Sequence, residues 1–176
     1  SELCESGQAE PKNIAILYRA NFQSRVLEEA LLGKQIPYHV LGVKFFDRKE
    51  VRDILSYIRC SLNRESLSDI KRIINIPARG IGKVTLAKLF ANQFSELPAG
   101  MQIKINKFYA LLDEFKEYME AHTASESVKY ILEKSGMEKE LKEGGELELE
   151  RLENAKELVT LALKYDKFGS ESIDML

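Results

Sequence analysis

The chain has 176 residues, of which 44% are hydrophobic and 31% are charged, and its net charge is −2. This length fits one compact domain or two small ones, with enough apolar residues for a core. The sequence has neither an apolar run near the roughly 18 residues that span a bilayer nor a signal-peptide pattern. We therefore expect a cytoplasmic protein without a membrane partner. Cys4 and Cys60 lie far apart with no His or Cys pair nearby, which favours reduced thiols and no metal site.

The charges are distributed unevenly along the chain. The first 90 residues carry 15 Lys and Arg against 10 Asp and Glu, whereas the remaining residues carry 11 against 18. A basic segment of this kind can be the electrostatic footprint of a nucleic-acid site. Solvated helix faces that happen to carry Lys and Arg would produce the same imbalance, so the charges alone do not decide.

The first 41 residues predict a small α/β part. Residues 1–12 are polar and fit a linker or a cloning remnant. The short apolar runs 13–18 and 35–41 have the length and composition of strands. Between them, apolar residues recur at helical spacing, with Asn21 as the expected cap and Gly33 as the expected end.

The rest of the chain is predicted to be helical. Asp47 and Glu50 have the spacing of a capping box, which indicates a helix start. No strand pattern occurs beyond residue 95, so the fold class we expect is mainly α with a small α/β part. The further helices are expected at about 67–74, 83–90, 102–121, 125–135, 137–143 and 147–167.

The loop between two of these helices reads Pro77-Ala-Arg-Gly-Ile-Gly-Lys-Val-Thr85. It is not a Walker A loop, because Pro77 stands where the first glycine belongs and Val84 stands where a hydroxyl should follow the lysine. Glycines let a backbone approach a phosphate closely, and a helix N-terminus adds free N–H donors. The loop therefore predicts a DNA-backbone contact, although a turn that packs two helices is the alternative. The predicted contacts are Arg79, Gly80, Gly82, Lys83 and Thr85.

No catalytic constellation is evident. His39 and His122 have no nucleophile or metal partner at a diagnostic spacing. The many Glu residues between 133 and 157 fit solvated helix faces better than a paired acid and base. The residues alone thus give no reason to expect catalysis by this chain.

Several motifs in order resemble the UvrD/Rep/PcrA-type DNA helicases of superfamily 1. They are the run 14–31, then Ile36-Pro-Tyr38, Gly42 with Phe45–Glu50 and Asp53, Asn75–Gly82, and later Arg151-Leu-Glu-Asn154 with Glu157-Leu. The resemblance implies an incomplete RecA-like (P-loop NTPase) segment, the first part of domain 2A, over 13–95. It implies a truncated, all-helical 2B subdomain over 96–176. Val43 departs from a usual Gly-Gly pair, and the stretch between Phe90 and Leu97 is shorter than in better-known members.

The resemblance also implies roles for particular residues. Tyr18 would stack on adenine, and Arg19 would act as an arginine finger toward the γ-phosphate of ATP. Arg48 and Lys49 would lie beside the single-stranded DNA track. The alternatives without a ligand are that Tyr18 caps a core strand, that Arg19 is solvated, and that Arg48 and Lys49 lie on a surface helix with internal ion pairs. Phe45 and Phe46 fit core positions better than base-stacking platforms.

The implied function is that of a fragment of a bacterial-type, ATP-dependent DNA helicase acting in repair or replication. Its cofactor would be ATP with Mg²⁺ in the intact protein, and its partners would be single-stranded DNA, duplex DNA and the remaining motor domains. Because the Walker A and B motifs lie outside this sequence, we expect the chain alone to be inactive as an ATPase. The alternatives are a stand-alone helical DNA-binding module and a helical scaffold whose acidic second half binds proteins.

Overall fold

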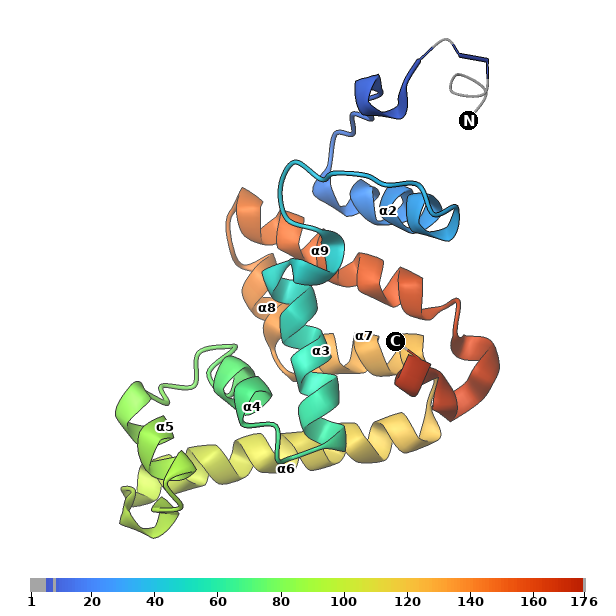
Figure 1. Ribbon diagram of the computed structural model, residues 1–176. Coiled ribbons are helices and arrows are strands. Elements are labelled where there is room, and N and C mark those ends of the chain that lie inside the picture. Colours follow the sequence, from blue (N-terminus) through green and yellow to red (C-terminus); the bar gives the residue numbers. More distant parts are fainter. Residues whose placement is uncertain (1–5, 8, 176) are drawn as a thin grey trace. The chain divides into compact units, whose positions relative to one another are not determined.

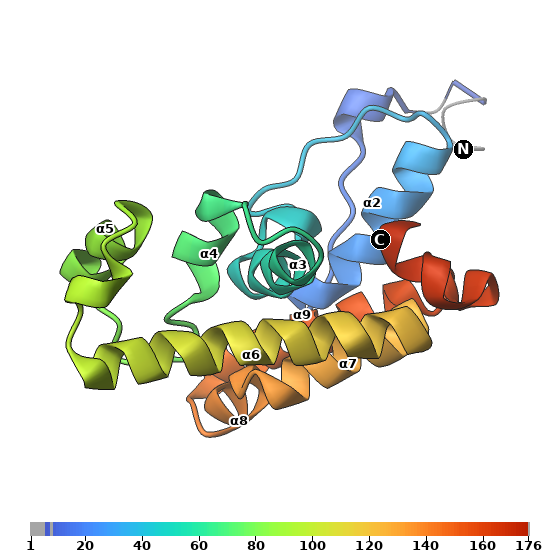
Figure 2. The same cartoon turned by 90° about the horizontal axis from the view of Figure 1, so that it is seen from below.

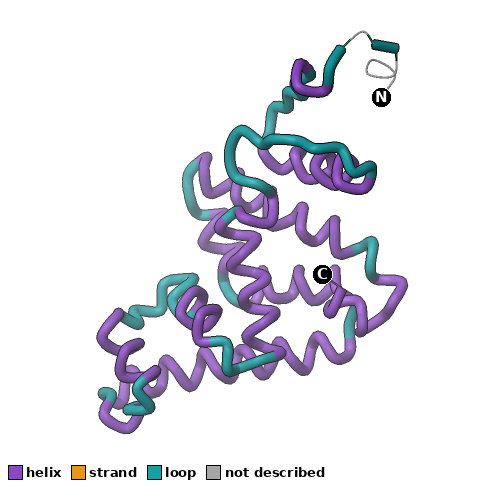
Figure 3. The backbone as a smooth tube through the Cα atoms, viewed as in Figure 1, coloured by secondary structure: helices purple, strands orange, loops and turns teal. Residues whose placement is uncertain are grey.

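A computed structural model describes residues 6–7 and 9–175 of the chain (Figure 1). The chain divides into two compact units, residues 1–39 and 40–176. Throughout the described residues the regular elements are helices, joined by turns and extended segments, and none is a strand (Figure 3). Part of the expected linker 1–12 lies outside these residues.

The first unit contains the 3₁₀ turns Pro11–Asn13 and Asn21–Gln23 and the helix α2, Ser24–Gly33. The end of α2 at Gly33 is as predicted. The expected cap is wrong, because Asn21 begins the 3₁₀ turn and Gln23 is the residue that precedes the helix.

The two predicted strands, 13–18 and 35–41, are wrong. An extended backbone is stable as a strand only when a neighbouring strand pairs with its N–H and C=O groups. Within the described residues neither segment forms such a ladder, and the apolar Leu17 and Leu41 are each 92% exposed. The described chain therefore contains no α/β layer and no RecA-like part. The composition of these runs was that of strands, but the pairing that makes a strand is absent from the described residues.

The second unit is a helical body centred on α3, Lys49–Leu62. The stripe Val51, Ile54 and Ile58 is buried, as the helical spacing of its apolar residues predicts. The helix packs against four others, so it forms the middle of the core. Those helices and their neighbours are α4 (Leu67–Ile73), α5 (Lys83–Phe90), α6 (Ala99–Ala121), α7 (Ala124–Lys134), α8 (Met137–Lys142) and α9 (Glu146–Ala162).

The long helix α6 lies alongside α7 (Figure 2). Its residues Ile105, Phe108, Leu112 and Phe115 recur every three or four positions and are buried. The helix begins just after Pro98, because a proline fits the start of a helix but not its interior. One unit thus contains helices from both sides of the expected domain boundary near residue 95, and that boundary stays a prediction.

The start of α3 and the end of α9 differ from the positions predicted from the sequence. Asp47 lies in the 3₁₀ turn Phe45–Asp47, and Arg48 is the cap residue of α3, so the predicted capping box is wrong. The helix α9 ends at Ala162 rather than near 167, and the 3₁₀ stretch Asp166–Met175 follows it.

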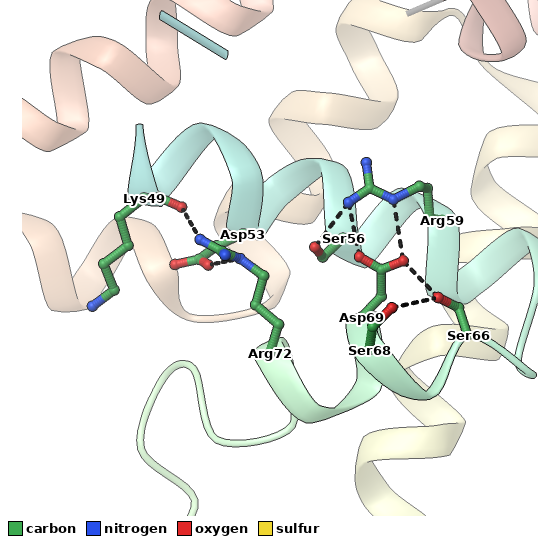
Figure 4. A network of polar contacts seen from close by, with 8 residues as sticks. All are labelled: Lys49, Asp53, Ser56, Arg59, Ser66, Ser68, Asp69 and Arg72. Atoms are coloured by element: carbon green, nitrogen blue, oxygen red, sulfur yellow. Dashed lines mark hydrogen bonds and ion pairs between the residues drawn. The ribbon is translucent and has the colours of Figure 1, made fainter. Parts of the chain in front are cut away.

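Ion pairs fasten α4 to α3 and so position the loop that follows α4 (Figure 4). Arg72 Nε lies 2.6 Å from Asp53 Oδ1, and Arg59 Nη2 lies 2.8 Å from Asp69 Oδ1. Burial raises the pKa of Asp53, and the neighbouring Arg72 charge opposes that effect. Burial would also raise the pKa of Asp69, but hydrogen bonds from Arg59, Ser56 and Ser66 together lower it to about 2.

Candidate nucleic-acid interface

The loop 75–82 leaves α4 and ends at the start of α5. The Asn75 side chain organises it, because Oδ1 accepts hydrogen bonds from the backbone N–H groups of Arg79 (2.7 Å) and Ile81 (3.1 Å). Gly80 has φ of +70°, a left-handed conformation that an L side chain rarely adopts. Ile81 is buried, whereas Gly80 and Gly82 on either side of it are exposed. The loop is thus anchored at its middle residue and presents both glycines to solvent.

The Arg79 side chain turns inward, toward the protein. Nη2 donates to the Tyr57 hydroxyl at 2.8 Å and lies 3.4 Å from the Ser135 carbonyl oxygen. The guanidinium carbon lies 5.5 Å from the centre of the Phe108 ring. Nη1 has two N–H donors, which share four backbone oxygens. These belong to Ile73 (3.2 Å), Ile74 (3.3 Å), Ile76 (2.9 Å) and Pro77 (3.3 Å).

Tyr57 connects this arginine to the centre of the core. Its side chain is fully buried on α3, and its hydroxyl donates to the Ile76 carbonyl while accepting from Arg79. Burial raises the pKa of Tyr57 to about 12, although the Arg79 charge lowers it, so the hydroxyl keeps its proton at neutral pH. The hydrogen bonds from Arg79 to Tyr57 and from Tyr57 to Ile76 therefore keep the same donors and acceptors around pH 7.

The exposed edge of the loop carries two lysines. Lys83 is the first residue of α5, and Lys104 reaches the loop from α6: its Nζ lies 3.0 Å from the place where a Cβ on Gly80 would be. Both side chains are exposed, and neither makes an ion pair in the part of the chain that the structure describes. The cap residue Gly82 has no side chain to accept the first N–H groups of α5. Thr85 is half-buried in the same first turn of α5, two residues after Lys83.

This edge can hold an anion. It combines two ammonium groups that make no ion pair with any described residue, exposed glycine backbone and the N-terminal end of a helix, which carries a partial positive charge. Of the five contacts predicted from the sequence, Gly80, Gly82 and Lys83 lie together at this edge, with Thr85 near by. Arg79 belongs to the same loop but its charge faces the opposite way.

Arg48, at the start of α3, is buried, unlike the exposed lysines at the edge of the loop. This side chain is only 7% exposed; its Nη1 donates to Asn154 Oδ1 of α9 at 2.7 Å, and its guanidinium lies over the Phe45 ring. Asn154 Nδ2 in turn donates to Glu50 Oε1 at 2.7 Å. All three polar side chains are buried, so they form a bridge between α3 and α9. The DNA contact expected of Arg48 stays a prediction, and in this structure its guanidinium does not face solvent.

The neighbours of Arg48 differ in exposure. Lys49 is exposed, and its backbone carbonyl accepts a hydrogen bond from Arg72 Nη2 at 3.1 Å. Phe45 is buried and Phe46 is 49% exposed, with their rings edge to face. Phe45 therefore has the expected core position, whereas the core position expected of Phe46 is wrong, because its side chain is half exposed. Lys49 remains available for a phosphate.

Tyr18 and Arg19 belong to the first unit. They follow the extended segment 14–18, and Tyr18 is 37% exposed while Arg19 is exposed. The backbone N–H groups of Arg19 and Ala20 both donate to Gln23 Oε1 at 3.1 Å, which fixes the turn before α2. Their expected contacts with ATP stay predictions.

Sequence reasoning missed two residues of these sites. Lys104 lies in a helix far along the chain from the loop, and no local pattern marks it. Asn154 belongs to a motif that resembles a helicase family, but the spacing of that motif does not predict that Asn154 is buried against Arg48.

Among the described residues, no three His, Cys, Asp or Glu side chains gather as a metal site. No described helix is sufficiently long and apolar to cross a membrane.

The comparison with known families defines the class of protein. The chain matches the UvrD-like helicase C-terminal domain over residues 1–174, and it belongs to that family. Among its relatives is the ATP-dependent DNA helicase PcrA of Staphylococcus aureus (strain NCTC 8325 / PS 47), which is 36% identical over 176 residues. That alignment covers 89% of this chain and 24% of the relative. The PcrA helicase of Staphylococcus epidermidis (strain ATCC 12228 / FDA PCI 1200) is also 36% identical, over 171 residues, covering 88% and 24%. The chain thus spans about a quarter of the length of the curated relatives it matches.

Proposed function

We propose that this chain is a working part of an ATP-dependent DNA helicase and contributes backbone contacts to DNA. The observation that carries the proposal is the exposed edge of the loop 75–82. There, two lysines without ion pairs among the described residues flank two exposed glycines at the start of α5. Membership of the UvrD-like C-terminal family supports this reading. We assign the first part of the chain to domain 2A and the later helices to domain 2B on the resemblance described above.

The proposed DNA contacts follow from exposure. Gly80, Gly82 and Lys83 approach a phosphate from the loop, Lys104 adds a second cation from α6, and Thr85 can donate its hydroxyl from the first turn of α5. Lys49 is the proposed contact at the start of α3. Such contacts position a backbone and read no base sequence, which suits an enzyme that moves along DNA of any sequence.

Tyr18 and Arg19 are proposed to act on ATP in the longer helicase. An exposed tyrosine ring offers a flat face for adenine, and a guanidinium keeps its charge next to a transferring phosphoryl group. In the full-length helicase we expect Arg19→Ala to lower ATP hydrolysis by about 10³- to 10⁵-fold, the range for arginine fingers. If Arg19→Ala hydrolyses ATP at the wild-type rate, the ATP role is wrong.

Binding of a fluorescent oligonucleotide by the isolated chain tests the DNA role. We expect weak affinity for single-stranded and duplex DNA, little sequence preference, and a decline of about 0.7 in log K per log salt for each single-stranded phosphate contacted. ATP hydrolysis by the same sample should be negligible. Tight, sequence-selective binding at physiological salt would instead support the stand-alone DNA-binding module.

A further inference from the structure

The guanidinium of Arg79 is placed where it can fix the shape of the loop 75–82. It is the loop's only arginine, and its charge is directed at the protein rather than at the exposed edge with Gly80 and Gly82. It contacts backbone or side-chain oxygens at the end of α4, on α3 and between α7 and α8, and it lies over a ring of α6. One side chain therefore connects the loop to α3, to the end of α4, to α6 and to the turn between α7 and α8.

In this geometry the terminal N–H donors of the Arg79 guanidinium are already used by protein acceptors, so few remain for DNA. Bidentate capture of a phosphate uses two parallel N–H groups of one guanidinium edge. The N–H groups of Nη1 are directed at backbone carbonyls, and Nη2 donates to the Tyr57 hydroxyl. A phosphate bound bidentately would have to displace buried acceptors, which would then lose their hydrogen bonds.

Loss of the Arg79 guanidinium contacts would change the shape of the exposed edge. Arg79 immediately precedes Gly80, whose φ of +70° sets the direction of the backbone toward Lys83. Glycine loses more backbone freedom on ordering than any other residue, so an edge built on two glycines depends on its neighbours for a fixed shape. The Asn75 side chain holds the backbone N–H of Arg79, and the guanidinium holds the carbonyls before it.

We propose that Arg79 is a positioning residue, which holds Gly80, Gly82 and Lys83 in the shape that accepts a DNA phosphate and does not itself contact DNA. This inference rests on the proposed function, since it assigns a role within the same interface. It replaces the direct contact predicted for Arg79 from the sequence, and it gives Tyr57 a part in DNA binding from inside the core.

Three variants of the chain test the inference, with Lys83→Ala as the matched control. Arg79→Gln removes the charge, and Arg79→Lys keeps the charge without the planar set of donors. Tyr57→Phe removes the hydroxyl that accepts from Arg79 and donates to Ile76, and it leaves Arg79 itself intact. For each we would measure affinity for a labelled single-stranded oligonucleotide across a salt series. Hydrogen exchange of the backbone amides in 75–85 is measured on the same proteins without DNA.

We expect the three variants to weaken binding about five- to thirtyfold, with an unchanged salt dependence and faster exchange in the loop. Lys83→Ala should lower the salt slope by about 0.7 and leave exchange as in the wild type. The inference is overturned if Arg79→Gln lowers the salt slope as Lys83→Ala does while Arg79→Lys and Tyr57→Phe bind normally. It is equally overturned if affinity and exchange are unchanged in Tyr57→Phe, which decides the matter even if an Arg79 variant does not fold.

The two proposals can fail separately. If Lys83→Ala leaves affinity and salt slope unchanged, the exposed edge does not bind DNA and the proposed function is wrong. If Lys83→Ala behaves as expected and the Arg79 and Tyr57 variants bind like the wild type, only the positioning role is wrong.

Discussion

Replacement of Asn154 by alanine tests the buried bridge between α3 and α9. The amide of Asn154 accepts from Arg48 and donates to Glu50, each at 2.7 Å, and the three side chains are at most 7% exposed. Alanine removes both hydrogen bonds at once. It also leaves a space where the amide was, because the surrounding helices cannot close completely.

The expected cost follows from these two bonds. A hydrogen bond to a charged group contributes ~1.5–3 kcal/mol, and bonds that share one residue do not add fully. We therefore expect Asn154→Ala to lower the free energy of unfolding by about 3 kcal/mol. That is a large part of the total of a domain whose stability is typically ~5–15 kcal/mol.

Urea denaturation followed by circular dichroism gives the measurement. The urea concentration at the unfolding midpoint should fall, while the slope of the unfolding free energy against urea stays the same. This is expected when stability changes without a change in the surface exposed on unfolding. Lys156→Ala is the matched control on α9, because the Lys156 side chain is half exposed and its ion-pair partner Glu153 is also half exposed. It should change stability by less than about 0.5 kcal/mol. A loss no larger than that in Asn154→Ala would refute the bridge.

Two further predictions concern ionisable groups of α3 and α4. The pKa of Asp69 is lowered to about 2, so the stability that its pairing with Arg59 provides is present above the ordinary pKa of 3.8 and is lost as pH falls from about 4 to about 2. We expect Asp69→Asn to cost about 1 kcal/mol at pH 6, because solvent screens the half-exposed Arg59, and to cost clearly less near pH 2, where protonation has removed much of the Asp69 charge; an equal loss at both values would count against the pairing. Burial, with the nearby Asp69 charge, raises the pKa of the Cys60 thiol to about 12. In a Cys4→Ser variant, Cys60 should react with a thiol reagent only as fast as the protein unfolds, and rapid reaction of the native protein at pH 8 would contradict its burial.

The helices of the second unit could be predicted from the sequence because their signals are local. The apolar stripe of α3, the proline before α6 and the glycines between later helices each act within a few residues. The end of α2 at Gly33 was predictable for the same reason. Their caps were less predictable, since Arg48 rather than Asp47 is the cap residue of α3.

The strands and the direction of the arginines could not be predicted. Whether 13–18 becomes a strand depends on a partner that no local pattern specifies. Arg48 and Arg79 have the residue type of phosphate ligands, but a long side chain can turn inward when buried acceptors are within reach. Asn154 and the carbonyls around Arg79 supply those acceptors. Lys104 belongs to the site only because the fold brings the Nζ of this α6 residue close to Gly80.

The salt dependence of DNA binding by the wild type and by the double variant Lys83→Ala, Lys104→Ala tests the central claim most directly. If both lysines contact phosphates, the slope of log K against log salt should fall by about 1.4 on single-stranded DNA and about 1.8 on duplex DNA. The double substitution should leave the unfolding midpoint unchanged, since both side chains are exposed. An unchanged slope with unchanged affinity would show that the exposed edge of the loop 75–82 does not bind DNA.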